Sequence, residues 1–207
     1  MNELTIEVED DPVPIVKIIA AQFERSMRYP EFVRTARGLN GSFALASTVD
    51  PQAVTVTGKG GRIRVKHGIS PEAGLVIRLD FNKPDESPNI EGLWRHPLLA
   101  LKVDKLMKTY DTDWADCAER FWRKSAQYPG MPEAIQVRCT DTPGELTLGK
   151  GEPEVTIEAS SKNLCELLSG GTILVLAVME GKVRIVGTMK HLTILSEATK
   201  DMLLGEC

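Results

Sequence analysis

The fold is decided by the stretch Ala177-Val-Met-Glu-Gly-Lys-Val-Arg-Ile-Val-Gly187, in which a glycine and a lysine separate two apolar segments. The pair Gly181-Lys182 is typical of a tight turn, and the alternation over 183–186 predicts a short β-strand. The preceding residues 172–179 are almost all apolar, and residues 192–204 carry apolar side chains at helical spacing. We therefore expect an apolar segment, a turn, a strand and a closing helix in succession.

Upstream of this stretch, the second half of the chain predicts one helix, three strands and a further helix. Apolar side chains recur at helical spacing within 112–127, and Tyr128-Pro129-Gly130 ends that helix. The other helix begins after Ser160-Ser161 and stops at Gly170-Gly171. The three strands between them are predicted at Ala134–Thr140, Glu145–Leu148 and Glu154–Ala159.

The first half of the chain begins with an acidic, polar segment at 1–12, which we expect to be a tail that can include a short strand at Leu4–Val8. Pro14 favours the start of a helix, and apolar residues follow at helical spacing until Tyr29-Pro30. Pro97 favours the start of another helix within the apolar segment 93–106. Between these helices, alternating apolar residues predict strands at Ser42–Thr48, Ala53–Thr57, Arg62–Lys66 and Gly74–Phe81, with a hairpin turn at Gly58-Lys-Gly-Gly61.

The order of elements recurs in the two halves, which suggests an internal repeat. Phe23-Glu-Arg-Ser-Met-Arg-Tyr-Pro30 aligns with Trp122-Arg-Lys-Ser-Ala-Gln-Tyr-Pro129, so that both helices end at Tyr-Pro. Ala53–Val56 similarly aligns with Ala134–Val137. We therefore predict three parts: a polar tail at 1–12, a diverged first lobe at 13–110 and a second lobe at 111–207.

Composition and charge exclude several functional classes. The chain has 207 residues, of which 42% are hydrophobic and 26% charged, and a formal net charge of −4. These values are typical of a folded globular chain rather than a disordered one. Lys and Arg are spread along the whole chain, so we expect no nucleic-acid partner.

No apolar run reaches the roughly 20 residues of a membrane helix. The acidic start is unlike a secretory signal, so we expect the chain to be cytoplasmic.

The residues that usually carry chemistry form no recognisable pattern. Cys117, Cys139, Cys165 and Cys207 are far apart and contain no CxxC pair, so we expect free thiols. The three histidines stand alone, without the short spacing of a zinc site. No Gly-x-Ser-x-Gly motif and no nucleophile placed beside a base are visible. We therefore predict no catalytic residue, no metal and no cofactor.

The second half of the chain resembles the sterol carrier protein-2 family. The resemblance is clearest over residues 145–207, and a looser match extends over the whole second half. It covers Glu154–Glu158, Ser161–Gly170 and the helix Leu192–Leu204, and it is sharpest at Ala177–Gly187. Thr188 departs from it, since the family usually has an acidic residue there. The resemblance implies an α+β fold with a mixed, largely antiparallel sheet and helices packed on it, and the internal repeat suggests two tandem lobes of this kind. It also implies an apolar tunnel that binds sterols, fatty acids or acyl-CoA-like lipids.

The expected ligand is therefore an apolar small molecule, held by side chains of the second lobe. Alternate residues of a strand share a face, as do helix residues three or four positions apart. The predicted ligand-binding residues are Leu168, Leu176, Met179, Val183, Ile185, Leu192, Leu195 and Met202. They would wall a cavity of several hundred Å³, the usual size of a ligand site.

Two other functions remain open on the sequence. The first is an enzyme that acts on an apolar polyketide or terpenoid intermediate in the same pocket, with His96, Asp104 or His191 as its reactive group. The second is a structural or partner-binding protein with a filled core. The sequence leaves the oligomeric state undetermined.

Overall fold

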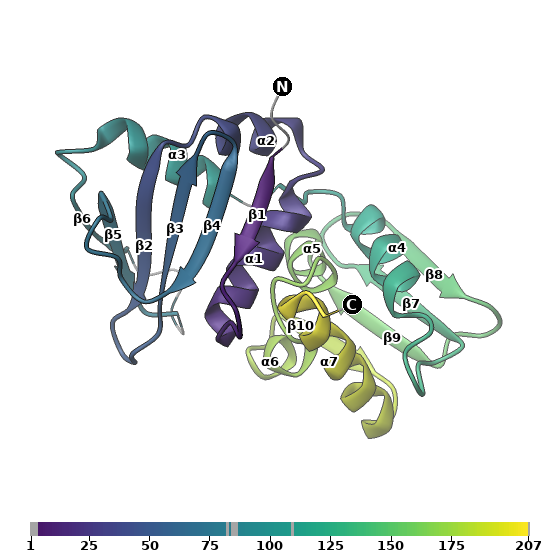
Figure 1. Cartoon of the computed structure of the whole chain (residues 1–207). Coiled ribbons are helices and arrows are strands. Elements are labelled where there is room, and N and C mark those ends of the chain that lie inside the picture. The colour runs from purple at the N-terminus through teal and green to yellow at the C-terminus, as the bar shows by residue number, and fades with distance from the viewer. Residues whose placement is uncertain (1–3, 82, 84–86, 109, 207) are drawn as a thin grey trace. The chain divides into compact units, whose positions relative to one another are not determined.

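The computed structural model describes residues 4–81, 83, 87–108 and 110–206. The chain divides into two compact units, Met1–Tyr110 and Asp111–Cys207. Each unit consists of a mixed β-sheet with helices packed on it (Figure 1). Most neighbouring strands in the described residues are antiparallel, and three pairs are parallel. The expected α+β class with a mixed, largely antiparallel sheet is confirmed.

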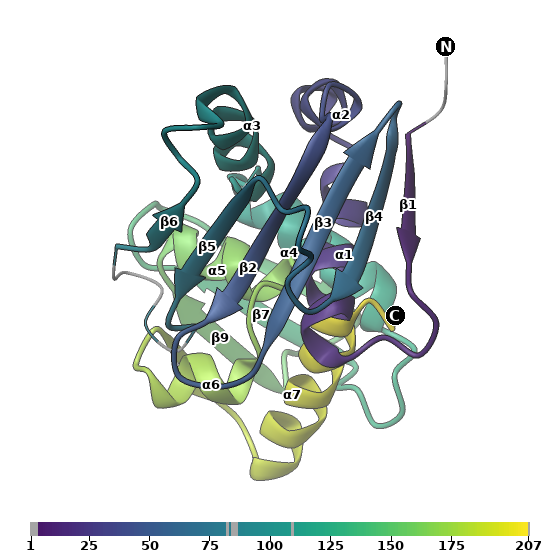
Figure 2. The same cartoon turned by 60° about the vertical axis from the view of Figure 1, so that its left-hand side comes forward.

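The first unit contains a six-stranded sheet in the order β1-β4-β3-β2-β5-β6, which Figure 2 shows face on. Strand β2 pairs in antiparallel fashion with β3 and in parallel fashion with β5. The hairpin between β3 and β4 turns at Gly60 and Gly61, both with positive φ, as a two-residue hairpin requires. The strands are β1 (Thr5–Val8), β2 (Gly41–Ser47), β3 (Ala53–Lys59), β4 (Arg62–His67), β5 (Leu75–Leu79) and β6 (Asn89–Glu91).

Three helices pack against this sheet: α1 (Pro14–Ser26), α2 (Pro30–Arg37) and α3 (Pro97–Met107). Each begins with a proline, which loses no hydrogen bond in the first turn of a helix. Their apolar sides and one face of the strands form a single core. It includes Phe23, Phe32, Phe43, Val54 and Ile63, all fully buried. The other face of the sheet contributes no side chain of β3 or β4 to this core.

The second unit contains a four-stranded sheet in the order β10-β9-β7-β8. Strand β7 pairs in antiparallel fashion with β8 and in parallel fashion with β9. Asp113, Ser160 and Thr188 cap the helices α4, α5 and α7 with their side-chain oxygens. The elements are α4 (Trp114–Ser125), β7 (Ala134–Cys139), β8 (Glu145–Gly149), β9 (Val155–Ala159), α5 (Ser161–Leu168), α6 (Leu174–Met179), β10 (Val183–Val186) and α7 (Met189–Leu204).

The helices α1 and α4 end in the same way in the two units. The Ser26 hydroxyl donates to the Gln22 carbonyl at 2.8 Å, and the Ser125 hydroxyl donates to the Phe121 carbonyl at 2.8 Å. The backbone N–H three residues after each serine then donates to that serine's carbonyl, at 3.0 and 2.8 Å. The sequence similarity at Tyr-Pro therefore corresponds to one local structure that occurs twice.

The short strand that the sequence allows at Leu4–Val8 is present as β1, which pairs with β4, and Leu4 is buried in the core, so the segment 1–12 is not a tail throughout. The alignment of Ala53–Val56 with Ala134–Val137 fails. Strand β7 has the neighbours of β2, not those of β3, because β2 and β7 each lie between an antiparallel and a parallel strand. Alternating apolar residues predict a strand but not its place in a sheet.

Candidate functional site

Six of the eight predicted ligand-binding residues lie in or against one apolar cluster of the second unit. Leu168, Val183, Leu195 and Met202 are at most 5% exposed. Ile185 and Leu192 are partly buried and pack against them. The fully buried ring of Phe121 belongs to the same cluster. The sequence thus identified residues that the fold brings together, and they are packed side chain against side chain.

The other two predicted residues, Leu176 and Met179, point outward, with 47% and 78% of their surface exposed. They lie on α6, which turns Leu174 and Ala177 into the core instead. Val186 and Met189, which follow along β10 and α7, are also exposed, at 50% and 75%. We refer to Leu176, Met179, Val186 and Met189 as the outer apolar residues. Because α6 is apolar on every side, its outward face has no polar group to present to water.

Helix α6 packs against α7 and is tied to it by one buried hydrogen bond. The Leu174 N–H donates to the Thr199 hydroxyl oxygen at 3.0 Å, and this hydroxyl donates to the Leu195 carbonyl at 2.9 Å. Thr199 is only 1% exposed. The first N–H groups of a helix have no partner within it, so this side chain completes the start of α6.

The residues considered for an enzymatic role are separated along the chain. His96 and Asp104 are exposed in the first unit, at the start and within α3. His96 and Asp104 are eight positions apart, which corresponds to about 12 Å along a helix, so the two side chains are too far apart to act on one atom. In the second unit, His191 Nε2 lies 3.5 Å from Glu154 Oε2. Its Nδ1 atom is buried and makes no hydrogen bond with a described residue.

The described cysteines are buried, and the surroundings of Cys165 favour an unreactive thiol. Cys117, Cys139 and Cys165 form no disulfide. Burial raises the pKa of the Cys165 thiol, and the nearby carboxylates of Asp111 and Asp113 act in the same direction. A raised pKa keeps sulfur protonated, and a protonated thiol is neither a nucleophile nor a metal ligand. Across the part of the chain that the structure describes, no three His, Cys, Asp or Glu side chains gather as a metal site would require.

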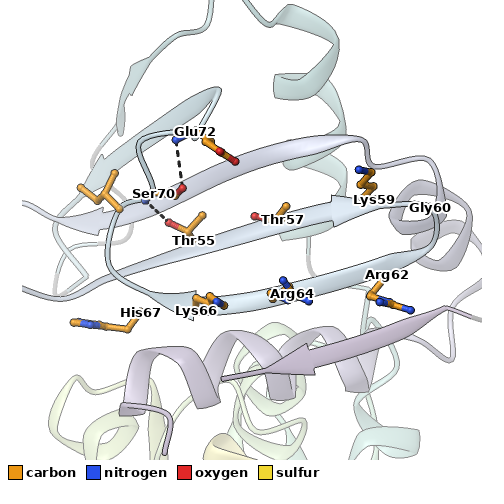
Figure 3. Close-up of a pocket in the computed structure, with 11 residues that line it drawn as sticks. Thr55, Thr57, Lys59, Gly60, Arg62, Arg64, Lys66, His67, Ser70 and Glu72 are labelled. Atoms are coloured by element: carbon orange, nitrogen blue, oxygen red, sulfur yellow. Dashed lines mark hydrogen bonds between the residues drawn. The ribbon is translucent and has the colours of Figure 1, made fainter. Parts of the chain in front are cut away.

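The first unit has a cavity of about 520 Å³ on the face of its sheet opposite the core (Figure 3). Its floor is formed by β3 and β4, and the loop after β4 forms one wall. No predicted ligand-binding residue lines this cavity, nor a second cavity of about 460 Å³ beside Trp122. The lining residues of the first are Thr55, Thr57, Lys59, Gly60, Arg62, Arg64, Lys66, His67, Ile69, Ser70 and Glu72.

Sequence reasoning missed this cavity, although the sequence holds a signal for it. The strand Arg62-Ile-Arg-Val-Lys66 alternates cations with apolar residues. Alternate residues of a strand share one face, so Ile63 and Val65 enter the core and the three cations gather on the opposite side. The even spread of Lys and Arg along the chain conceals this concentration.

No helix among the described residues has the length and apolar character needed to cross a membrane.

No protein-family model matches the chain, and no curated protein matches it. Several solved structures are similar to it, among them the following two. One is a sterol carrier protein 2 structure, with 14% identity, 91% of this chain and 93% of that chain covered, and a TM-score of 0.22. The other is a conserved hypothetical protein from Thermus thermophilus, described as possibly a sterol carrier protein. It has 13% identity, 100% and 94% coverage, and a TM-score of 0.23.

Proposed function

We propose that the second unit binds an apolar small molecule such as a fatty acid or a sterol. The observation that carries this proposal is helix α6, six apolar residues with Leu176 and Met179 turned to solvent. Exposed apolar groups that cluster on a soluble protein commonly mark a binding site. Each CH₂ of a ligand buried there contributes about 0.8 kcal/mol, with no need for directional bonds.

The proposed ligand enters between α6 and α7. Leu195 and Met202 line the buried side of α7, and methionine side chains adapt to ligands of different shape. A hydrogen bond from the backbone N–H of Leu174 to the Thr199 hydroxyl oxygen anchors the start of α6. A helix of six residues is too short to be stable without its packing, so moving it costs little internal structure. The apolar cluster beneath would then receive the chain of the ligand.

We also propose that the chain is a distant member of the sterol carrier protein-2 family and that its two units are diverged copies. Three features support this: the motif at 177–187, the repeated helix end at Ser26 and Ser125, and the shared strand order of the two sheets. Family members bind sterols and fatty acids, which agrees with the proposed ligand.

A fluorescent fatty acid tests the binding proposal directly. We expect the wild-type protein to bind it and Leu176→Glu/Met179→Glu to weaken binding at least tenfold, because a charge opposes burial of an acyl chain. The matched control is Leu98→Glu/Leu101→Glu on α3 of the first unit, where both leucines are also exposed. The control should bind like the wild type. No binding by the wild type, or equal loss in both variants, would contradict the proposal.

The main alternative is a filled core with a partner-binding role. It is favoured by the near-complete burial of Leu168, Leu195 and Met202, none of which lines either of the two cavities described above. Leu195→Trp separates the two functions. If the core opens for a ligand, the indole fills that space, and fatty-acid binding is lost while the melting temperature is kept. If the core is permanently filled, the larger side chain costs about 1–3 kcal/mol of stability.

A further inference from the structure

The floor of the cavity in the first unit is a ladder of cross-strand pairs, each of which includes a cation. Lys59 lies opposite Arg62, Thr57 opposite Arg64, and Thr55 opposite Lys66. All six side chains line the cavity (Figure 3). Since a strand rises about 3.3 Å per residue, successive pairs are about 7 Å apart. The cations therefore extend along the strand rather than meeting at one point.

Positive charge on this face is only partly balanced. Arg62 and Arg64 both pair with Glu7 of β1, each at 3.0 Å. Neither Lys59 nor Lys66 makes an ion pair with any residue that the structure describes. The lining contains four permanent cations and one carboxylate, that of Glu72, in a chain whose net charge is −4. Like charges this close repel one another, and a bound anion would remove that repulsion.

The wall of the cavity is fixed by hydrogen bonds. The Thr55 hydroxyl donates to the Gly68 carbonyl at 2.6 Å and accepts from the Ser70 N–H at 2.9 Å. Ser42 on β2 donates its hydroxyl hydrogen to the Glu72 carbonyl at 2.7 Å. These bonds hold the loop after β4 over the sheet. A site whose wall is fixed by its own hydrogen bonds loses less entropy when it binds.

The shape and composition of the cavity indicate which kind of anion it can bind. A volume of about 520 Å³ is that of a small-molecule site. No Phe, Tyr or Trp side chain lines it, so nucleic-acid bases would lack the large aromatic rings on which they usually stack. A concave site also fits a discrete molecule better than the plane of a membrane. We propose that this face binds a small molecule with two or more linked phosphate groups, since the first and third pairs are about 13 Å apart and one phosphate cannot contact cations along that whole length.

Isothermal titration calorimetry with inorganic tripolyphosphate tests the proposal. We expect the wild-type protein to bind tripolyphosphate at least ten times more tightly than orthophosphate, and less tightly as salt rises. Lys59→Ala/Lys66→Ala should weaken binding at least tenfold. The control Lys162→Ala/Lys190→Ala removes the same charge from exposed positions of the second unit and should stay within twofold of the wild type.

Several results would overturn the proposal. They are no binding of tripolyphosphate at low salt, equal loss in both double variants, or a preference for single-stranded DNA or anionic phosphatidylglycerol vesicles over tripolyphosphate. The lysines are exposed, so the variants should fold, and circular dichroism checks this. Lys59→Arg/Lys66→Arg retains the charge and should retain most of the binding. The site lies in the first unit and does not depend on the proposed apolar ligand, so either proposal can fail alone.

Discussion

In the first unit, β2 lies between an antiparallel β3 and a parallel β5, and β6 follows at the edge. In the second unit, β7 lies between an antiparallel β8 and a parallel β9, and β10 follows at the edge. Phe43 pairs with Leu75 in one unit, Ile135 pairs with Val155 in the other, and all four are at most 1% exposed. Four strands of each unit thus have the same order, directions and inward-facing positions.

The units differ in what they add to these four strands. The first adds β4 and β1, which extend the sheet and carry charged side chains over its open face. The second places α5 and α6 between β9 and β10 and exposes apolar side chains there. The proposed sites therefore combine the two parts: β3 of the shared strands and the added β4 form the floor of the cationic cavity, and the added α6 carries the exposed apolar side chains of the second unit.

The largest expected effect tests whether the shared positions are equivalent. Phe43→Ala should lower the free energy of unfolding by about 3–5 kcal/mol, and Ile135→Ala by about 2–5 kcal/mol, because each leaves a cavity in a packed core. Urea unfolding followed by circular dichroism measures both. The control is Val49→Ala, 58% exposed, which should change stability by less than about 0.5 kcal/mol. A cost below about 1 kcal/mol at either core position would break the equivalence.

A smaller effect should distinguish the second unit. Thr199→Val keeps the shape of the side chain but leaves the Leu174 N–H without its partner, at a cost of about 1–3 kcal/mol. Amide hydrogen exchange in this variant should accelerate more in α6 than in the sheet. Thr193→Val serves as the control, because the Thr193 hydroxyl bonds only to a carbonyl of its own helix at an exposed position. Equal stability losses in the two variants would show that Thr199 does not anchor α6.

The smallest effect concerns the repeated helix end. Ser26→Ala and Ser125→Ala each remove one hydrogen bond to a helix carbonyl but introduce a better helix former. We expect losses of no more than about 1 kcal/mol that agree between the units within about 0.5 kcal/mol. Thermal unfolding of the two single variants measures this difference. A loss confined to one serine would mean that the similar ends of α1 and α4 have different roles.

Most elements of the fold could be predicted from local patterns. The starts at Pro14 and Pro97, the cap at Ser160 and the turn at Gly60-Gly61 all follow from residues with strong backbone preferences. The short β6 could not be predicted, since its three residues show no alternation and depend on pairing with β5. Strand order also depends on pairing between distant residues, which caused the mistaken alignment of β3 with β7.

The candidate sites could be predicted only in part. Residues 172–179 are apolar in nearly every position, so helix and strand could not be separated by periodicity, nor could inward and outward side chains. This is why the sequence predicted Leu176 and Met179 beside Leu195, whereas the structure places them outside the cluster that holds Leu195. The cationic face required one further step, the assignment of Arg62 and Lys66 to the same side of a strand.

The strand β1 has a consequence for self-association. An edge strand offers unpaired N–H and C=O groups that can recruit a strand from another molecule and so begin aggregation. Strand β1 occupies the edge of β4 along Arg62–Val65, and the ion pairs of Glu7 with two arginines help to hold it there. At four residues, it is itself a short template. Strand β1 thus covers the longer edge of β4, which could otherwise pair with a strand of a neighbouring molecule.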